Sequence, residues 1–306
     1  MAMDDHSISR RRFVKDASIL AAGGSLLAAS IARGQAAQAK APSKKPADKW
    51  RMRLSTSTIQ YTKLTIEQAC KRIADLGFEG IDIWSGHAGC PHLDDVAKRL
   101  GGDGLKAVLV KNKLKLYSFS VYRGGYRKYA KLLGDAGGGV AVRGSTRGCK
   151  PSELTARMKA YIESLKPEIE LAEKYDSYLA IENHGGSLLN SLDSFKAFVD
   201  INTSKRLGIA LAPYHLQRRK ISVPDTIKAT GKQLLFFYAW QAAKGTGQLP
   251  GIGPADCVEW LKALQDIRYK WYVNPFMHHQ PDPDKMTAAL KKSVDYLKKC
   301  CDKLGA

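Results

Sequence analysis

The stretch Tyr178–Gly186 reads YLAIENHGG, an apolar run that ends in a carboxylate, an amide, an imidazole and two glycines. A short apolar run bounded by turn residues is typical of a strand buried in a parallel sheet. A carboxylate at the end of such a strand is costly to bury unless a ligand or partner group uses it. The stretch therefore predicts a parallel strand with Glu182 at its functional end, and the rest of the chain decides the kind of sheet.

Similar apolar runs recur along the chain and alternate with segments of helical pattern. The predicted strands are Arg53–Thr58, Gly80–Trp84, Leu114–Ser120, Gly138–Val142, Tyr178–Glu182, Leu207–Leu211, Leu234–Trp240 and Trp271–Asn274. Helices between consecutive strands make neighbouring strands parallel, and eight such units close into a barrel, so the sequence predicts a single-domain (β/α)8 TIM barrel. An open doubly wound sheet is the alternative, and it is disfavoured because no G-x-G-x-x-G motif follows the first strand.

The segments between the strands carry start and stop signals for helices. Thr65–Leu76 begins with Thr65 and Gln68 in the spacing of a capping box and is followed by Gly77. Further helices are predicted over Ser152–Tyr175 with a kink at Pro167, over Pro254–Asp266 and over Asp284–Lys303. The Tyr-, Arg- and Gly-rich segment Tyr122–Lys131 is predicted to be a loop over the barrel mouth.

The N-terminal segment is predicted to lie outside the barrel. Ser9–Lys15 reads SRRRFVK and precedes an apolar, small-residue run at Ala17–Ile31 and an A-x-A site at Ala37–Ala39. This order is typical of a secretory signal, and the arginine pair resembles a twin-arginine signal. We predict a cleavable signal peptide over residues 1–39, a linker over 40–50 and the barrel over 51–306, with export by the twin-arginine machinery to the periplasm or beyond. A retained membrane anchor is the alternative, but the run falls short of the ~20 apolar residues that span a bilayer.

Charge and cysteine content narrow the possible partners. The formal net charge is +20, and the basic residues are spread along the chain without a nucleic-acid motif. Since export also separates the protein from nucleic acids, no nucleic-acid partner is expected. The six cysteines contain no C-x-x-C pair, which excludes a zinc ribbon. We expect free, buried thiols, and the alternative is a single disulfide that forms late.

Several of these stretches together resemble the xylose-isomerase-like barrel family, which includes sugar isomerases, sugar 3-epimerases, inosose-type dehydratases and endonucleases acting on abasic sites. The resemblance rests on ADLGFEGIDIW (Ala74–Trp84), YLAIENHGG, LGIALAPYH (Leu207–His215), GQLPGIGPADCVEWLKAL (Gly247–Leu264) and the end at Tyr272–Asn274. It implies a carbohydrate or polyol substrate and proton abstraction next to a carbonyl group. It also implies one divalent metal ion, such as Mn, Mg or Zn, bound at the strand ends.

The metal ligands of the family carry over only in part. The family uses a Glu, an Asp, a His and a second Glu, and Glu182 matches the first of them. Ala212, Tyr238 and Asn274 stand at the other positions. Alanine offers no donor atom, a tyrosine hydroxyl stays protonated at neutral pH, and an amide adds no charge. The resemblance therefore implies an eroded metal site, at most a displaced set of Glu182, His215 and Asn274.

The predicted strand ends still carry groups for chemistry. Glu182 is the predicted base, and His215 or His184 is the predicted acid. The predicted substrate-binding residues are Trp84, His87, His184, Tyr238, Trp240, Asn274 and His278. The sequence thus predicts a sugar isomerase or epimerase, and the alternative is a catalytically inactive barrel that binds a carbohydrate. A barrel endonuclease is disfavoured because the carboxylates for its zinc ions are missing.

Overall fold

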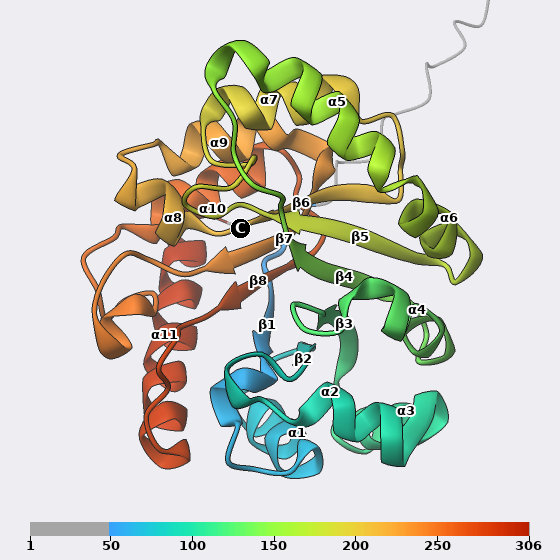
Figure 1. Ribbon diagram of the computed structural model, residues 1–306. Helices are drawn as coiled ribbons and strands as arrows, with labels where there is room; N and C mark the ends of the chain where they lie inside the picture. Colours follow the sequence, from blue (N-terminus) through green and yellow to red (C-terminus); the bar gives the residue numbers. More distant parts are fainter. Residues whose placement is uncertain (1–48, 306) are drawn as a thin grey trace, which may run out of the picture. The chain divides into compact units, whose positions relative to one another are not determined.

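The computed structural model describes residues 49–305, which form a closed barrel of parallel strands numbered in chain order around the ring (Figure 1). The strands are β1 (Arg53–Ser57), β2 (Gly80–Trp84), β3 (Lys115–Ser120), β4 (Gly139–Gly144), β5 (Ser177–Glu182), β6 (Leu207–Leu211), β7 (Leu234–Ala239) and β8 (Tyr272–Pro275). β1 pairs with both β2 and β8, which closes the ring. The predicted TIM barrel is confirmed. The predicted signal peptide and the linker as far as residue 48 lie outside the described residues.

Helices follow the strands and surround the ring (Figure 1). They are α1 (Ile66–Asp75), α2 (His92–Asp95), α3 (Gly101–Lys111), α4 (Gly125–Asp135), α5 (Leu154–Ser164), α6 (Lys166–Lys174), α7 (Leu192–Ile201), α8 (Pro213–Arg218), α9 (Val223–Thr230), α10 (Cys257–Asp266) and α11 (Pro283–Lys303). The predicted capping box of α1 is present, with Gln68 N–H donating to the Thr65 hydroxyl. Within residues 49–305, none of the helices combines the length and the apolar character that a bilayer crossing needs.

One predicted helix is broken in the structure. Ser152–Tyr175 forms two helices, α5 and α6, which meet at Leu165. Pro167 has no backbone N–H and so cannot continue the helical hydrogen bonds across this point. The amide of Leu165 instead bonds the carbonyl of Ile162, which tightens the last turn of α5. The prediction of one kinked helix was wrong because the proline ends a helix here.

The prediction of a loop over Tyr122–Lys131 was also wrong. From Gly125 the chain forms α4, whose buried residues are Tyr126, Tyr129, Ala130 and Leu133. Their spacing is that of one helix face, and this period outweighs the turn-like composition of the segment. The two glycines that precede this face, Gly124 and Gly125, both have positive φ and form the turn into the helix.

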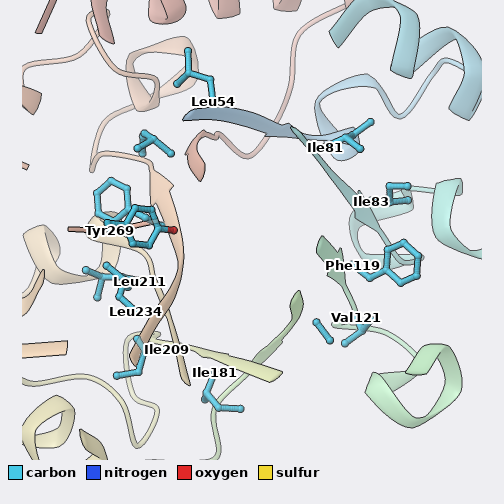
Figure 2. Close-up of a cluster of buried hydrophobic side chains, with 14 of the residues drawn as sticks. Leu54, Ile81, Ile83, Phe119, Val121, Ile181, Ile209, Leu211, Leu234 and Tyr269 are labelled. Carbon is cyan, nitrogen blue, oxygen red and sulfur yellow. The ribbon is translucent and has the colours of Figure 1, made fainter. Parts of the chain in front are cut away.

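The strand residues alternate between two apolar clusters. One set points outward and packs under the helices, and Figure 2 labels its members Leu54, Ile81, Ile83, Phe119, Ile181, Ile209, Leu211 and Leu234, together with Val121 and Tyr269 from segments next to the strands. The other set fills the barrel interior and includes small residues on β5 and β6, Ala180 and Ala210. Large rings occupy the remaining interior space, where Tyr117 stacks on Phe236 with ring centres 4.8 Å apart. The barrel is therefore a packed core, and open space for a ligand lies at its end.

All six cysteines are free in the described part of the chain. Burial raises the pKa of Cys70 and of Cys90 to about 12, so both thiols stay protonated at neutral pH. Only thiolates react readily with oxidants and disulfides. These two thiols therefore serve as small apolar groups in the core. The predicted burial holds for five of the six cysteines, since Cys149 is only half-buried.

Candidate functional site

A cavity of about 750 Å³ lies at the carboxyl ends of the strands, where TIM barrels carry their active sites. Seven of the nine predicted site residues line it: Trp84, His87, Glu182, His184, His215, Trp240 and His278. Tyr238 and Asn274 are buried below its floor. Arg147 and Tyr214 also line the cavity, as do Lys244 and Gln248, which sequence reasoning did not assign.

Aromatic rings form one wall of the cavity. The ring of Tyr214 stacks on Trp240 at 4.3 Å between ring centres, and the ring of His278 lies 5.1 Å from Trp240. Gln248 fixes this wall, because its side-chain oxygen accepts hydrogen bonds from Trp240 Nε1 at 2.8 Å and from the backbone amide of His278 at 3.2 Å. Trp84 adds a further ring to the lining. Sugar rings bind to such surfaces through their C–H faces, so the wall fits a carbohydrate.

Two histidines face each other beside this wall. The ring centres of His184 and His215 are 4.0 Å apart. Burial, followed by the charges of His184 and His278, lowers the pKa of His215 to about 3. Burial and the neighbouring His87 likewise lower the pKa of His278 to about 4. Both imidazoles are neutral at pH 7, so His215, which the sequence predicted as an acid, would act through the N–H of a neutral ring.

In the local sequence Glu182–His184 the middle side chain supports the fold and the two outer ones line the cavity. Asn183 turns to the neighbouring strand, where its amide donates to the carbonyl of Ala212 at 3.1 Å and accepts from the Ala212 N–H at 2.7 Å. This pair of bonds fixes the end of β6 against β5. Glu182 and His184, on either side of Asn183, line the cavity. Asn183 therefore positions the backbone that leads to His215.

Glu182 is the one carboxylate among the described residues that line the cavity. It is 9% exposed, and Tyr122 donates a hydrogen bond of 2.8 Å to its Oε2. Burial raises the pKa of Glu182 to about 7, the Tyr122 hydrogen bond opposes this, and the charge of Asp82 adds to it. A carboxylate with a pKa near the working pH accepts and returns protons efficiently.

A chain of hydroxyl groups runs from Glu182 into the barrel. The hydroxyl of Tyr122 lies 3.1 Å from that of Tyr238, and Tyr238 lies 3.4 Å from the hydroxyl of Ser120. Ser120 donates to both carboxylate oxygens of Asp82 at 3.0 Å. Burial keeps the pKa of both tyrosines well above the ordinary value, so these hydroxyls are protonated. The chain thus links the two buried carboxylates through neutral groups.

Asp82 is a buried polar residue that the sequence analysis did not assign. Its carboxylate accepts hydrogen bonds from Ser57, Ser118, Ser120 and the indole of Trp84, at 2.6 to 3.0 Å. Burial raises the pKa of Asp82 to about 6. The signal in the sequence was its place two residues before Trp84 in an apolar strand, since strand alternation puts both on the inner face.

Tyr238 and Asn274 belong to the floor of the site, which corrects their predicted contact with substrate. Tyr238 is bonded as described above, and the Asn274 amide nitrogen donates to the Ser57 hydroxyl at 3.1 Å.

Over residues 49–305, His, Cys, Asp and Glu side chains form no group of three or more that could hold a metal ion. The residues at the family's ligand positions, Ala212 included, therefore do not fit a divalent ion, and we derive no step through one.

The segment Pro250–Asp256, PGIGPAD, forms a tight turn that is held by the buried side chain of Gln241. Gln241 donates to the carbonyl of Leu249 at 2.7 Å and accepts from the amide of Ala255 at 2.6 Å. A Cβ at Gly253 would overlap both the Gly247 carbonyl and the Gln241 side chain. The glycine therefore allows Gln241 to hold this turn tightly after β7.

Residues 70–300 match the family described as xylose isomerase-like TIM barrel. The chain belongs to this family. The family assignment agrees with the closed barrel and with the resemblance found in the sequence. A search of curated proteins gave no match.

Solved structures of sugar epimerases share the fold at low sequence identity. The 3-keto-D-glucoside 4-epimerase YcjR from E. coli is 14% identical, with 80% of this chain and 100% of that chain covered and a TM-score of 0.62. D-Psicose 3-epimerase with D-tagatose from Clostridium cellulolyticum H10 is 15% identical over 81% and 99%, with a TM-score of 0.64. The IOLI protein with a bound zinc atom is 14% identical over 82% and 99%, with a TM-score of 0.63. At these identities the likeness shows the fold.

Proposed function

We propose that this protein is a sugar isomerase or epimerase that removes a proton next to a carbonyl group of a carbohydrate or polyol, without the usual metal set of its family. The observation that carries the proposal is the pairing of Glu182, whose pKa is raised to about 7, with neutral imidazoles in one cavity. Sugar epimerases among the solved structures of the same fold support the substrate class.

In the proposed reaction Glu182 is the base. Its carboxylate takes the proton from the carbon next to the carbonyl, and Tyr122 stays bonded to Oε2 throughout. The neutral imidazole of His215 donates its N–H to the carbonyl oxygen, which stabilises the charge that develops there. A neutral histidine serves as such an electrophile in triosephosphate isomerase. Return of the proton to the former carbonyl carbon, with the hydroxyl proton of the deprotonated carbon moving to the former carbonyl oxygen, gives an isomer. Release of the Glu182 proton to solvent and delivery of a solvent proton to the opposite face of the same carbon give an epimer.

The test is exchange of a carbon-bound proton with solvent. The purified protein, treated with a chelator, is incubated in D₂O with D-fructose, D-psicose or D-tagatose, and deuterium next to the carbonyl is followed by NMR. We expect incorporation with the wild type and a loss of at least about 10²-fold in Glu182→Gln. Incorporation that survives Glu182→Gln would remove Glu182 from the base role. Exchange that appears only when a divalent metal is added would contradict the metal-independent step.

The second candidate is a carbohydrate-binding barrel without catalysis. It is favoured by Ala212 and Asn274, which replace two carboxylates of the family's site. The two functions separate in one comparison: a binding protein retains a sugar that calorimetry detects, yet exchanges none of its protons in D₂O. The isomerase requires both binding and exchange.

We also propose that the protein is exported through the twin-arginine pathway, on the basis of the SRRRFVK motif and the following small-residue run. Fractionation of a host with this pathway is the test. The wild-type chain is expected outside the cytoplasm with its first residues removed, whereas Arg10→Lys combined with Arg11→Lys is expected to stay inside, uncleaved. Equal export of both chains would contradict the proposal.

A further inference from the structure

A second hollow adjoins the cavity of Glu182. It has a volume of about 570 Å³ and shares His87, Tyr122 and Gly144 with the main cavity. The two spaces thus meet at the residues that follow β2 and β3 and at the end of β4. We call the second hollow the side cleft. The main cavity alone is within the size range of sites for drug-sized ligands, and the side cleft extends it in one direction.

The far wall of the side cleft is polar and fixed. Arg143 donates to both carboxylate oxygens of Glu168, at 2.8 and 2.6 Å, and Arg127 lies 3.8 Å from the same carboxylate. The Glu168 side chain is only 11% exposed, so the pair of Arg143 and Glu168 holds its geometry. Guanidinium groups and carboxylates together offer both donors and acceptors to hydroxyl groups.

The junction between the two spaces combines rings with bare backbone. The rings of His87 and Tyr122 lie 5.7 Å apart, and Trp84 lies 4.9 Å from Tyr122. On the opposite side Gly144 has no atom within 4 Å of the place where a Cβ would be, and its φ is not in the positive range. The junction is therefore open at a position that has no side chain, although its backbone would accept one.

We propose that the substrate is a glycoside with a second sugar ring: one ring lies beside Glu182, and the second crosses Tyr122 into the side cleft, where Arg127, Arg143 and Glu168 bind its hydroxyl groups. This inference rests on the proposed function and extends it from a monosaccharide to a disaccharide-like ligand. Tyr122 takes part twice, since it holds Glu182 with its hydroxyl and meets the ligand at the junction.

Calorimetry with matched ligands tests the inference. The probes are D-fructose and D-glucose, compared with the disaccharides maltulose and lactulose, whose fructose unit keeps its carbonyl group, and with maltose and cellobiose. We expect at least one disaccharide to bind roughly tenfold more tightly than its monosaccharide, since the side cleft offers charged hydrogen-bond partners. In Gly144→Leu, which fills the junction, this ratio is expected to fall to about one. In the control Gly185→Leu, which adds the same side chain to the main cavity away from the side cleft, the ratio is expected to persist.

Arg127→Ala reports on the side cleft alone, because Arg127 does not line the main cavity and its side chain is 62% exposed. In this variant the affinity for the disaccharide is expected to fall severalfold, and the affinity for the monosaccharide is expected to stay the same. Monosaccharide binding with no gain for any disaccharide overturns the side-cleft proposal and leaves the proposed function standing. Equal losses for both ligands in Gly144→Leu also overturn it. Phenyl β-D-glucoside is compared with D-glucose in the same way. If its affinity exceeds that of D-glucose by as much as a disaccharide's does, the side cleft does not select a second sugar ring and the proposal is overturned. Absence of binding for every probe contradicts the proposed function itself.

Discussion

The hydroxyl of Tyr122 donates a hydrogen bond of 2.8 Å to Oε2 of Glu182 and joins the reactive carboxylate to the polar interior of the barrel. The same hydroxyl lies 3.1 Å from Tyr238, and through Ser120 this contact leads to Asp82. Tyr122 and Tyr238 therefore link two buried acids, Glu182 and Asp82, through hydroxyl groups.

Removal of the Tyr122 hydroxyl is expected to raise the pKa of Glu182 further. The hydrogen bond favours the ionised carboxylate and opposes the effect of burial, which holds the pKa at about 7. In Tyr122→Phe the pH at which half of Glu182 is ionised moves upward, and proton exchange at pH 7 slows severalfold because less base is present. Infrared difference spectra of the carboxyl C=O band against pH provide the measurement.

Tyr214→Phe is the matched control for this experiment. Tyr214 lines the same cavity and stacks on Trp240, but its hydroxyl is not the group bonded to Glu182. An unchanged carboxyl titration in Tyr122→Phe, or an equal shift in both variants, would show that the hydrogen bond does not set the pKa of Glu182.

Burial of Glu182 is expected to cost stability at neutral and alkaline pH. A carboxyl group with a pKa raised from 4.5 to about 7 binds its proton more tightly in the folded protein than in the unfolded chain. The stability from this group is complete below about pH 4.5 and is lost as the pH rises through about 7. Relative to Glu182→Gln, the wild type should lose roughly 3 kcal/mol in its free energy of unfolding across this window.

Urea unfolding of both proteins near pH 4.5 and near pH 8 measures this difference. Asp82, whose pKa is also raised, is present in both proteins, so much of its own pH dependence cancels in the comparison. A gap between wild type and Glu182→Gln that stays constant with pH would mean that Glu182 titrates normally in the folded state.

The imidazoles of His215 and His278 are expected to stay neutral throughout the usual working range of pH. Burial lowers their pKa values to about 3 and about 4. Ring nitrogen chemical shifts of ¹⁵N-labelled protein should therefore not change for these residues between about pH 5 and 8, the range in which an ordinary histidine titrates. In His215→Phe proton exchange should fall by about 10²-fold, the effect of losing one donor to a developing oxyanion. A titration of His215 near pH 6.5 would support a cationic acid in its place.

Asn183 is expected to stabilise the junction of β5 and β6 rather than to touch the substrate. Its side chain satisfies both backbone groups of the buried residue Ala212. Asn183→Ala leaves a buried N–H and carbonyl without these partners, which should lower the free energy of unfolding by about 1–3 kcal/mol. Asn112→Ala, which removes one bond to Val108 at a helix end, is the control and should cost less. Equal losses of stability in the two variants would contradict the special role of Asn183.

The sequence sufficed for the fold because each barrel strand is short, apolar and followed by a helix, and these signals are local. Gly80–Trp84 and Leu207–Leu211 were predicted with the bounds that the structure has. Seven of the nine residues predicted at the strand ends also line the cavity. Asp82 could not be predicted from the sequence because its role depends on hydrogen-bond donors from two other strands. These donors are Ser57 of β1 and Ser118 and Ser120 of β3, which come together only in the closed barrel.

The sequence also did not reveal how far each strand residue lies from the mouth of the barrel. Tyr238 and Asn274 follow the pattern of strand-end residues, and both were predicted to contact substrate. Their positions in β7 and β8 place them below the cavity floor, where they bond to other side chains of the barrel. Strand tilt and stagger decide which residue reaches the mouth of a barrel, and both are properties of the whole sheet.

The glycine-rich turn Pro250–Asp256 requires a glycine at position 253. A methyl group at Gly253 would overlap the Gly247 carbonyl and the side chain of Gln241, whose two hydrogen bonds hold the turn. Gly253→Ala is therefore expected to lower the free energy of unfolding by about 1–3 kcal/mol and to weaken sugar binding, because the displaced loop carries Gln248, the anchor of Trp240. Gly185→Ala is the control, since its Cβ meets no atom within 4 Å. Thermal unfolding and calorimetry of the two variants decide the matter: equal behaviour would mean that the turn has room for a side chain and that its glycine is not required for the site.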